Sequence, residues 1–490
     1  MPALIVASPL GRSGRTIVAV TASLLAIVAL MSINGRAVVS DSGQNLLMAV
    51  NLSHSGTISD SEQPPYEPSM YREPLPIVVN AVGVSVVDGL LGRTDSPQYF
   101  SGPRAKYIKY QNVAWLIGLW FAVFAATRYF TGSLWWSIAA GLLAAKPFLN
   151  SLSAEGVNDL YTELPAAVFM ICAIFLLVRA VQSNSKSGFI MAGLCYGLLA
   201  LTKAAMLYVF VGLVLVLLVT YVWASTQRKT RLLQVMMLCA SAAIVVTPWI
   251  ARNWMIFGQP QISERGGLVL YTRALMDQVT PTEYRGTFYM WARPAVRPFV
   301  GSILGFGPKD LEMGGRLQRL SDDLGTDLYK HDIQAQVAGR PQDAITLHWQ
   351  ARAERVRLER EFELQGVPHP EGAADRAMAR KGMSMVQNAF VQNLKLAVPL
   401  LWRSAPTIFP ALVIALAYGL LMRRYLLVLF VLPALGLVIF YAVATHFEPR
   451  PAVVAQSTAV IGVIATAYAL WQLRPHLRTA RPQLANPKTV

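Results

Sequence analysis

Charged residues at the ends of long apolar runs are the most informative chemical feature of this chain. Asp41 and Glu163 each stand beside such a run, and Lys203 lies inside one. Charges in or next to a membrane span are costly, so they are candidates for function. A carboxylate at a membrane surface can act as a general base on a hydroxyl or an amine, and nearby cations can neutralise a phosphate leaving group. The pattern fits transfer from a lipid-linked phosphate, although interfacial anchoring and salt bridging explain the spacing equally well.

Other charged residues occupy similar positions near the ends of the predicted spans. They are Lys146, Glu155, Asp159, Arg403, Glu448 and Arg450, with Asp41 and Arg252 just outside two spans. Ion-coupled transporters place ionisable groups near the membrane midplane, on broken helices. The middles of the predicted spans carry no charge here, which argues against ion-coupled transport.

Membrane-spanning helices must position these residues. The chain has 490 residues, of which 54% are hydrophobic and only 14% charged, a composition typical of a polytopic membrane protein. The stretch 188–224 is nearly twice the length needed to cross about 30 Å of hydrocarbon, so it is predicted to form two helices that turn at Lys203. With the single runs, this gives ten transmembrane helices in an all-α protein; the single runs are 16–33, 111–127, 134–150, 164–181, 232–250, 406–421, 425–443 and 453–471.

The loops between the spans differ sharply in charge. Short loops and tails on one side hold fourteen Lys and Arg and no Asp or Glu, whereas all twenty-seven acids lie in the opposite loops or near span ends on that face. Basic residues in short loops stay in the cytoplasm. The sequence therefore predicts that both termini are cytoplasmic and that carboxylate chemistry takes place on the outer face.

Two outer-face loops are large, and they divide the chain. The first, about 35–110, belongs to an N-terminal transmembrane region of residues 1–250 and has amphipathic stretches near 41–52 and 76–91. The second covers 251–394 and includes a segment with helical spacing at 341–365. Residues 395–490 form the C-terminal helices and a basic cytoplasmic tail.

Several function classes are disfavoured by the sequence. The net charge of +16 suits anionic lipid beside the spans better than nucleic acid, since no compact basic domain with interleaved aromatics is present. No nucleotide-binding fingerprint occurs. The three cysteines lie in apolar runs without disulfide or zinc spacing. The acids are numerous enough for a divalent ion, but they show no specific ligand pattern, so no cofactor is predicted.

Five short segments, in order along the chain, resemble the GT-C superfamily of polyprenyl-phosphate-sugar-dependent glycosyltransferases, in particular the branch with bacterial protein O-mannosyltransferases and the lipid A aminoarabinose transferase. An Asp soon after the first span opens an amphipathic helix, and a Glu stands at the start of the fourth span. A Leu-Thr-Lys pattern and a Pro-Trp…Arg-Asn…Phe-Gly pattern come later, followed by a weaker match near the end. The segments are SDSGQNLLMAVNLSHSG, YREPLPIVVNAV, SAEGVNDLYTELPAAVF, GLLALTKAAML and TPWIARNWMIFGQP, with HFEPRPAVVAQS as the weaker one.

The resemblance implies a role for each matching residue. Asp41 is the candidate general base and Glu163 matches the second acid of the family, while Lys203 and Arg252 are candidates for holding the donor phosphate. The chain departs from the family after Asp41, where Ser42, Gly43 and Gln44 replace the usual Glu and aromatic, and at Pro451, where Tyr is common. Further candidates are Arg450 for the phosphate, and Asp159, Glu155, Arg72 and His446 as additional site residues.

The prediction for function follows from the topology and the resemblance together. The chain is expected to be a glycosyltransferase of the bacterial inner membrane that moves a sugar from a polyprenyl-phosphate donor to an envelope acceptor on the outer face. The acceptor, whether lipid, glycan or protein, is not specified by the sequence. Two alternatives stay open: a transporter or flippase of lipid-linked sugars, and an inactive scaffold with the same fold.

Overall fold

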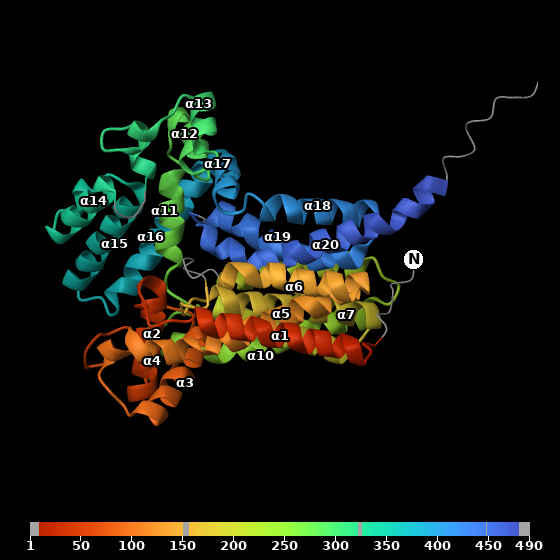
Figure 1. The fold of residues 1–490 in the computed structure, drawn as a ribbon. Coiled ribbons are helices and arrows are strands. Elements are labelled where there is room, and N and C mark those ends of the chain that lie inside the picture. Colours follow the sequence, from red (N-terminus) through yellow and green to blue (C-terminus); the bar gives the residue numbers. More distant parts are fainter. Residues whose placement is uncertain (1–8, 150–155, 322–325, 447, 480–490) are drawn as a thin grey trace, which may run out of the picture.

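The structure is a computed structural model that describes residues 9–149, 156–321, 326–446 and 448–479. Every regular element in these ranges is helical, as the sequence predicts. The helices form two parts that Figure 1 shows plainly: a bundle of long, roughly parallel helices, and a layer of shorter helices at one end of it.

The bundle contains a helix for each of the ten predicted spans. By length and composition, eight of the described helices could cross a membrane, one of them α3, which Figure 1 places in the end layer; α17 with α18 would make a ninth, and α6 and α8 are shorter apolar helices. The chain is therefore a multi-pass membrane protein. The bundle helices are α1 (Arg12–Ser32), α5 (Gln111–Thr131), α6 (Leu134–Leu149), α7 (Glu163–Ser183), α8 (Lys186–Thr202), α9 (Ala205–Leu217), α10 (Arg228–Phe257), α18 (Ile408–Leu421), α19 (Tyr425–Ala444) and α20 (Pro449–Thr479).

The helix break at Lys203 is confirmed. α8 ends at Thr202, Lys203 has extended backbone angles, and α9 begins two residues later. α8 also packs closely against α10, because Gly193 and Gly197 stand against that helix: a Cβ added at Gly193 would lie 2.2 Å from the Leu238 carbonyl oxygen. Small residues at this spacing allow helix backbones to approach closely in membranes. The break fixes Lys203 at the end of the bundle that carries the shorter helices.

The shorter helices come from the two large loops and lie at the same end of the bundle, opposite the end where α1 begins (Figure 1). The predicted helical segments at 41–52, 76–91 and 341–365 are α2, α3 and α15. Short turns of 3-10 helix occur at Ser96–Tyr99, Pro308–Leu311, Gln318–Leu320 and Pro341–Asp343, and a π turn at Leu218–Trp223 extends α9. The end-layer helices are α2 (Ser40–Ser55), α3 (Pro74–Leu91), α4 (Gly102–Lys109), α11 (Gly266–Met276), α12 (Pro281–Met290), α13 (Arg297–Leu304), α14 (Asp327–Val337), α15 (Leu347–Leu364), α16 (Pro370–Asn388) and α17 (Phe390–Ser404).

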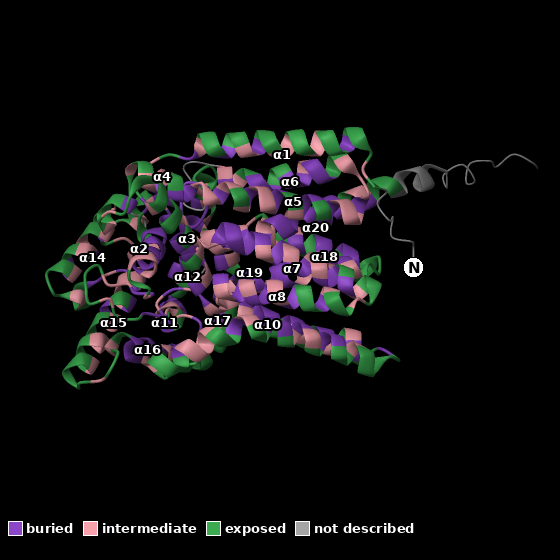
Figure 2. Cartoon of the chain, turned by 90° about the horizontal axis from the view of Figure 1, so that it is seen from below, coloured by how far each residue is buried: buried purple, intermediate pink, exposed green. Residues whose placement is uncertain are grey.

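The main core lies along the bundle axis. α5, α7, α19 and α20 meet there, and Figure 2 shows α7 largely buried while α1 is exposed along much of its length. Trp120 of α5 is fully buried and occupies the space left by Gly141 of α6, where an added Cβ would lie 2.7 Å from its ring. A smaller core joins part of the end layer, with Tyr271, Ala351 and Met378 linking α11, α15 and α16. The end layer is thus packed on its own and also against the bundle.

Candidate active site

Asp41 is the meeting point of three distant segments. It lies in the first turn of α2, where the positive end of the helix dipole favours a carboxylate. Its Oδ1 is 2.9 Å from Arg72 Nη2 and 3.0 Å from Arg265 Nη1, and its Oδ2 is 2.5 Å from Arg450 Nη2. Arg72 precedes α3, Arg265 caps the start of α11 and Arg450 stands at the start of α20. Asp41 is therefore held by both large loops and by the bundle.

Glu163 forms a second, more deeply buried pair. It is the first residue of α7, and its side chain is 1% exposed. Its Oε1 accepts a hydrogen bond from Lys203 Nζ at 2.9 Å and lies 3.4 Å from Arg450 Nε. Lys203 Nζ also lies 3.5 Å from the hydroxyl of Thr162. The helix break at Lys203 is what allows its side chain to reach the start of α7.

Arg450 joins the two acids into one cluster. Its guanidinium contacts Asp41 on one side and Glu163 on the other, and its centre lies 4.6 Å from the ring of Tyr161. The cluster therefore contains two carboxylates and four cations, with a formal surplus of two positive charges; its members are Asp41, Glu163, Arg72, Lys203, Arg265 and Arg450. A surplus of this kind is suited to binding an anion such as a phosphate.

The arginines decide the ionisation of Asp41. Burial alone raises the pKa of its carboxyl, but Arg265, Arg72 and Arg450 outweigh that effect and hold the pKa well below its usual range. Asp41 is therefore a carboxylate at neutral pH. It can accept a proton efficiently only after the guanidiniums have been drawn toward another anion, because an acid with so low a pKa is a weak base.

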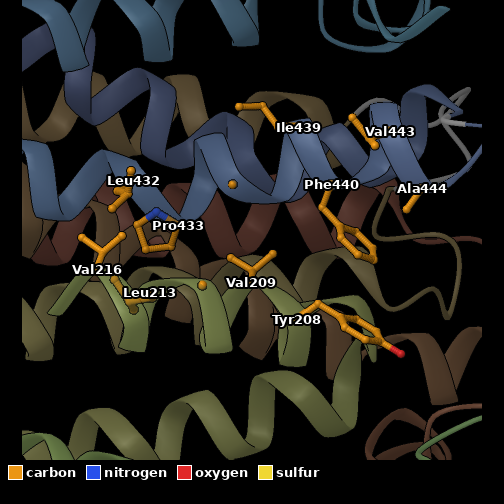
Figure 3. A pocket seen from close by; sticks show the side chains of 12 residues that line it. Tyr208, Val209, Leu213, Val216, Leu432, Pro433, Ile439, Phe440, Val443 and Ala444 are labelled. Carbon is orange, nitrogen blue, oxygen red and sulfur yellow. The ribbon is translucent and has the colours of Figure 1, made fainter. Parts of the chain in front are cut away.

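An apolar groove leads toward the cluster. It lies between α9 and α19, has a volume of about 440 Å³ and is shown in Figure 3. Tyr208 and Phe440 stack across it with ring centroids 5.3 Å apart. The neighbouring Tyr441 places its ring 5.9 Å from Lys203 Nζ. Because Phe440 lines the groove and Tyr441 follows it in the sequence, one end of the groove lies near Lys203. The groove is lined by Tyr208, Val209, Gly212, Leu213, Val216, Leu432, Pro433, Gly436, Ile439, Phe440, Val443 and Ala444.

The predicted site residues divide into those inside and those outside this cluster. Asp41, Glu163, Lys203, Arg450 and Arg72 are brought together. Arg252 is not among their partners in the described chain: its Nη1 donates to the carbonyl of Ser69 at 3.1 Å and its guanidinium packs on Trp249 and Phe257. Arg252 therefore supports the segment that leads to Arg72, and does so from outside the cluster.

The remaining candidates lie at the margins. Asp159 is paired with Arg36 at 2.5 Å. In the sequence it precedes Tyr161, whereas Glu163 follows Tyr161. His446 Nε2 is 3.2 Å from Glu448 Oε1, and that hydrogen bond lowers the pKa of Glu448 to about 2. Glu155 lies outside the described residues. No group of three metal-ligating side chains was found in the described parts of the chain, and the oxygens of Asp41 face guanidiniums.

Two residues of this site were not predicted from the sequence: Arg265, a member of the cluster, and Tyr161, whose ring lies beside Arg450. Arg265 occurs in SERGGLVL, a segment without a recognisable motif, and it contacts Asp41 across 224 positions of sequence. Tyr161 lies within a segment that resembles the family, yet nothing in that match singles it out. Because Arg265 comes from the loop with the poorest motif matches, only the three-dimensional structure could find it.

Comparisons with known proteins support the fold. No protein-family model matches the chain, and no curated protein matches it in sequence. Among solved structures, the apo oligosaccharyltransferase of Archaeoglobus fulgidus is 14% identical over 97% of this chain and 53% of its own, with a TM-score of 0.50. The enzyme from the same organism in complex with an inhibitory peptide and a dolichol-phosphate is 12% identical over 98% of this chain and 53% of its own, with a TM-score of 0.46. ArnT from Cupriavidus metallidurans bound to undecaprenyl phosphate is 14% identical over 98% of this chain and 82% of its own, with a TM-score of 0.38.

These similarities concern the class of fold. The apo oligosaccharyltransferase, at a TM-score of 0.50, shares its fold with this chain, and that fold is the GT-C fold that the sequence predicts. The chain spans about half the length of the oligosaccharyltransferase that it matches.

Proposed function

We propose that this chain is a membrane glycosyltransferase that moves a sugar from a polyprenyl-phosphate donor to an acceptor of the cell envelope. One observation carries the proposal: an ionised carboxylate and four cations form a single cluster beside an apolar groove. An oligosaccharyltransferase has the same fold, which supports transfer of a sugar from a lipid carrier. Fold alone does not define activity, so the chemistry of the cluster is the main argument.

The groove and the cluster suit the two ends of such a donor. The side chains of α9 and α19 that line the groove are almost all apolar, as a polyprenyl chain requires. The surplus of two positive charges next to it would bind the phosphate. Lys203 and Arg450 are the cations closest to the bundle, so we assign them the phosphate of the bound donor.

The reaction then proceeds with a defined exchange of bonds. The acceptor oxygen or nitrogen forms a bond to the anomeric carbon while the bond from that carbon to the phosphate oxygen breaks. The acceptor proton passes to the carboxylate of Asp41. The leaving polyprenyl phosphate gains one negative charge, which the cations of the cluster stabilise. Base catalysis of this kind accelerates reactions by about a hundredfold to ten-thousandfold.

Glu163 has a different part in this scheme. It is too buried to meet an acceptor, being 1% exposed, and both of its ionic partners are the cations assigned to the phosphate. We therefore propose it as a positioning residue that holds Lys203 and Arg450 in place. Asp41, with a side chain 17% exposed, is the acid that an acceptor can reach.

The membrane face follows from the charge distribution. The site lies at the end of the bundle where both large loops gather, and the short basic loops connect helices at the other end (Figure 1). Under the charge rule for short loops, we propose a bacterial inner membrane location with cytoplasmic termini and the site facing outward. A cysteine placed at the exposed Leu364 of α15 should react with a membrane-impermeant maleimide added to intact spheroplasts. Reaction only after lysis would place the site in the cytoplasm.

The proposal is tested most simply in cells. Lipid A, glycans, glycoproteins and lipid-linked sugars are compared by mass spectrometry in cells that carry the parent chain, Asp41→Asn or no copy of the gene. A glycan that is lost in the last two strains, with accumulation of its lipid-linked donor, is the expected result. A flippase of lipid-linked sugars would keep its product in the Asp41→Asn strain, and a scaffold would tolerate loss of Asp41 and Lys203 together.

A further inference from the structure

α17 runs crosswise to the bundle. It ends at Ser404, and α18 begins at Ile408 after a bend of 107°. α18 packs within the bundle, beside α19 and α20 (Figure 1). If α18 crosses the membrane, a helix at a nearly right angle to it lies in the plane of the membrane surface. α17 would then lie along that surface, at the end of the bundle where the cluster is found.

The two long sides of α17 are both apolar, but only one is covered. Leu396, Ala397 and Leu400 are buried against the protein. The opposite side is 37% to 64% exposed, and its spacing of three and four residues places its members on one face of a helix. We call this surface the α17 apolar face; it consists of Val391, Leu394, Val398 and Trp402.

A second exposed apolar surface lies beside it. α12 is attached to α17, because Tyr284 donates to the carbonyl of Lys395 and Trp402 donates to that of Phe288. In Figure 1, α12 and α13 lie at the end of the bundle that carries the shorter helices, farther from the bundle axis than α18. On α13, Phe299 and Ile303 are 69% and 65% exposed. A helical overhang at the membrane surface with uncovered aromatic and aliphatic side chains has the composition of an interfacial anchor.

We propose that the α17 apolar face, with Phe299 and Ile303 of α13, inserts into the boundary between headgroups and acyl chains of the bilayer. Two observations select lipid as the occupant over another protein. The bend sets α17 at nearly a right angle to α18, and α18, the adjoining candidate span, also has exposed apolar residues such as Ile414. Lys395 is exposed on α17, where it would meet lipid phosphates.

The insertion would also bear on the cluster. Asn393, on the covered side of α17, accepts a hydrogen bond at its carbonyl from Arg273 Nη2 at 2.7 Å and donates to Asp277 Oδ2 at 2.9 Å. Arg273 and Asp277 pair with each other at the end of α11, whose first cap is Arg265. α17 is thus linked, through α11, to Arg265, one of the three arginines that hold Asp41. The lipid contact itself does not depend on the proposed transfer reaction.

The test measures what surrounds α17 in the complete protein. Spin labels are attached singly at positions 391, 394 and 398 after the three native cysteines are replaced by alanine, and the protein is placed in nanodiscs of equal phosphatidylcholine and phosphatidylglycerol. Collisions with oxygen, which concentrates in lipid, are compared with collisions with a water-soluble nickel chelate. Val356 of α15, which is 43% exposed, carries the matched control label.

The expected result is a clear excess of oxygen over nickel collisions on α17 and the reverse at position 356. Substitution of both Leu394 and Val398 by Asp should raise nickel access at 391, whereas Val356→Asp should not. Nickel access on α17 equal to that at 356 would overturn the proposal, since the face would then lie in water. Low access to both reagents would also overturn it, because protein would then cover the face.

Discussion

The two halves of the charged cluster are built in different ways. The Asp41 half consists of Asp41, Arg72 and Arg265 and comes from the two large loops. The Glu163 half consists of Glu163 and Lys203 and comes from the bundle, and Arg450 joins the two. Asp41 is 17% exposed and contacts three guanidiniums, whereas Glu163 is 1% exposed and contacts Lys203 at 2.9 Å and Arg450 at 3.4 Å. The Asp41 half has an excess of positive charge and is partly exposed, whereas the charges of the Glu163 half are balanced and buried.

The difference between the two halves suggests that they contribute to different properties, one to substrate binding and transfer and the other to stability. Losing one member of a buried ion pair leaves an uncompensated charge in a medium of low dielectric constant. The Asp41 half, which is built from the two large loops and has surplus cations, can exchange its contacts with one anion for contacts with another. We therefore expect the loss of Glu163 to reduce mainly stability, and changes in the Asp41 half to affect mainly substrate binding and transfer.

The largest expected effect on stability is that of Glu163→Gln. It leaves Lys203 buried beside Arg450 without its nearest carboxylate, which should cost about 3–5 kcal/mol. Thermal unfolding of the detergent-solubilised protein measures this change. The double variant with Lys203→Met should recover much of the loss, because no unpaired charge then remains. Equal stability of Glu163→Gln and the parent would remove the distinction between the two halves.

Arg265→Met should act mainly on binding. Hydrogen bonds to charged groups contribute about 1.5–3 kcal/mol, so polyprenyl phosphate should bind about ten to a hundred times more weakly, with a smaller loss of stability than in Glu163→Gln. Arg316→Met is the matched control, because Arg316 comes from the same loop and is paired with Asp310 at an exposed position. If both variants bind equally well, Arg265 has no part in the site.

Glu264, the neighbour of Arg265, should make stability depend on pH. Burial raises its pKa to about 7, and Asp375 and Glu371 add to that effect. The folded state thus favours the protonated acid, so stability is retained below the unfolded pKa of about 4.3 and falls as pH rises through about 7. Glu264→Gln should be more stable than the parent by up to about 2 kcal/mol near pH 8, discounted for partial exposure, and equal to it near pH 4. The same gain at both pH values would contradict this account.

The smallest expected effect is that of Arg252→Met. Its guanidinium packs on Trp249 and Phe257 and lies outside the cluster, and such contacts contribute about 0.5–1 kcal/mol at exposed sites and about 2 kcal/mol when desolvated. Stability should fall by about 1 kcal/mol while affinity for polyprenyl phosphate stays unchanged. A tenfold loss of affinity would instead support the direct phosphate contact that the sequence motif predicts.

The two halves also differ in how far the sequence could predict them. Span lengths are fixed by bilayer thickness, so the bundle, the helix break at Lys203 and the start of α7 follow from the apolar runs. Glu163 and Lys203 were therefore placed on the correct elements. Asp41 and Arg72 were identified through motifs near the first and second predicted helices of the first loop.

The contacts between loops could not be predicted. Arg265 and Asp41 are 224 positions apart, and no periodicity or spacing relates them. The crosswise course of α17 was missed for a related reason. The predicted division between the second loop and the C-terminal region, after residue 394, falls inside α17, and only the 107° bend separates this helix from the span that follows. Long-range pairing and helix direction are properties of the packed structure.

The most direct test of the central claim measures donor binding and transfer separately in Asp41→Asn. The purified chain in nanodiscs is titrated with polyprenyl phosphate, and single-turnover transfer is followed with the donor and acceptor that the cell comparison identifies. The account predicts that transfer falls by about a hundredfold to ten-thousandfold, while polyprenyl phosphate binds at least as tightly as before, because a competing carboxylate has been removed. Transfer at the parent rate would show that Asp41 is not the base.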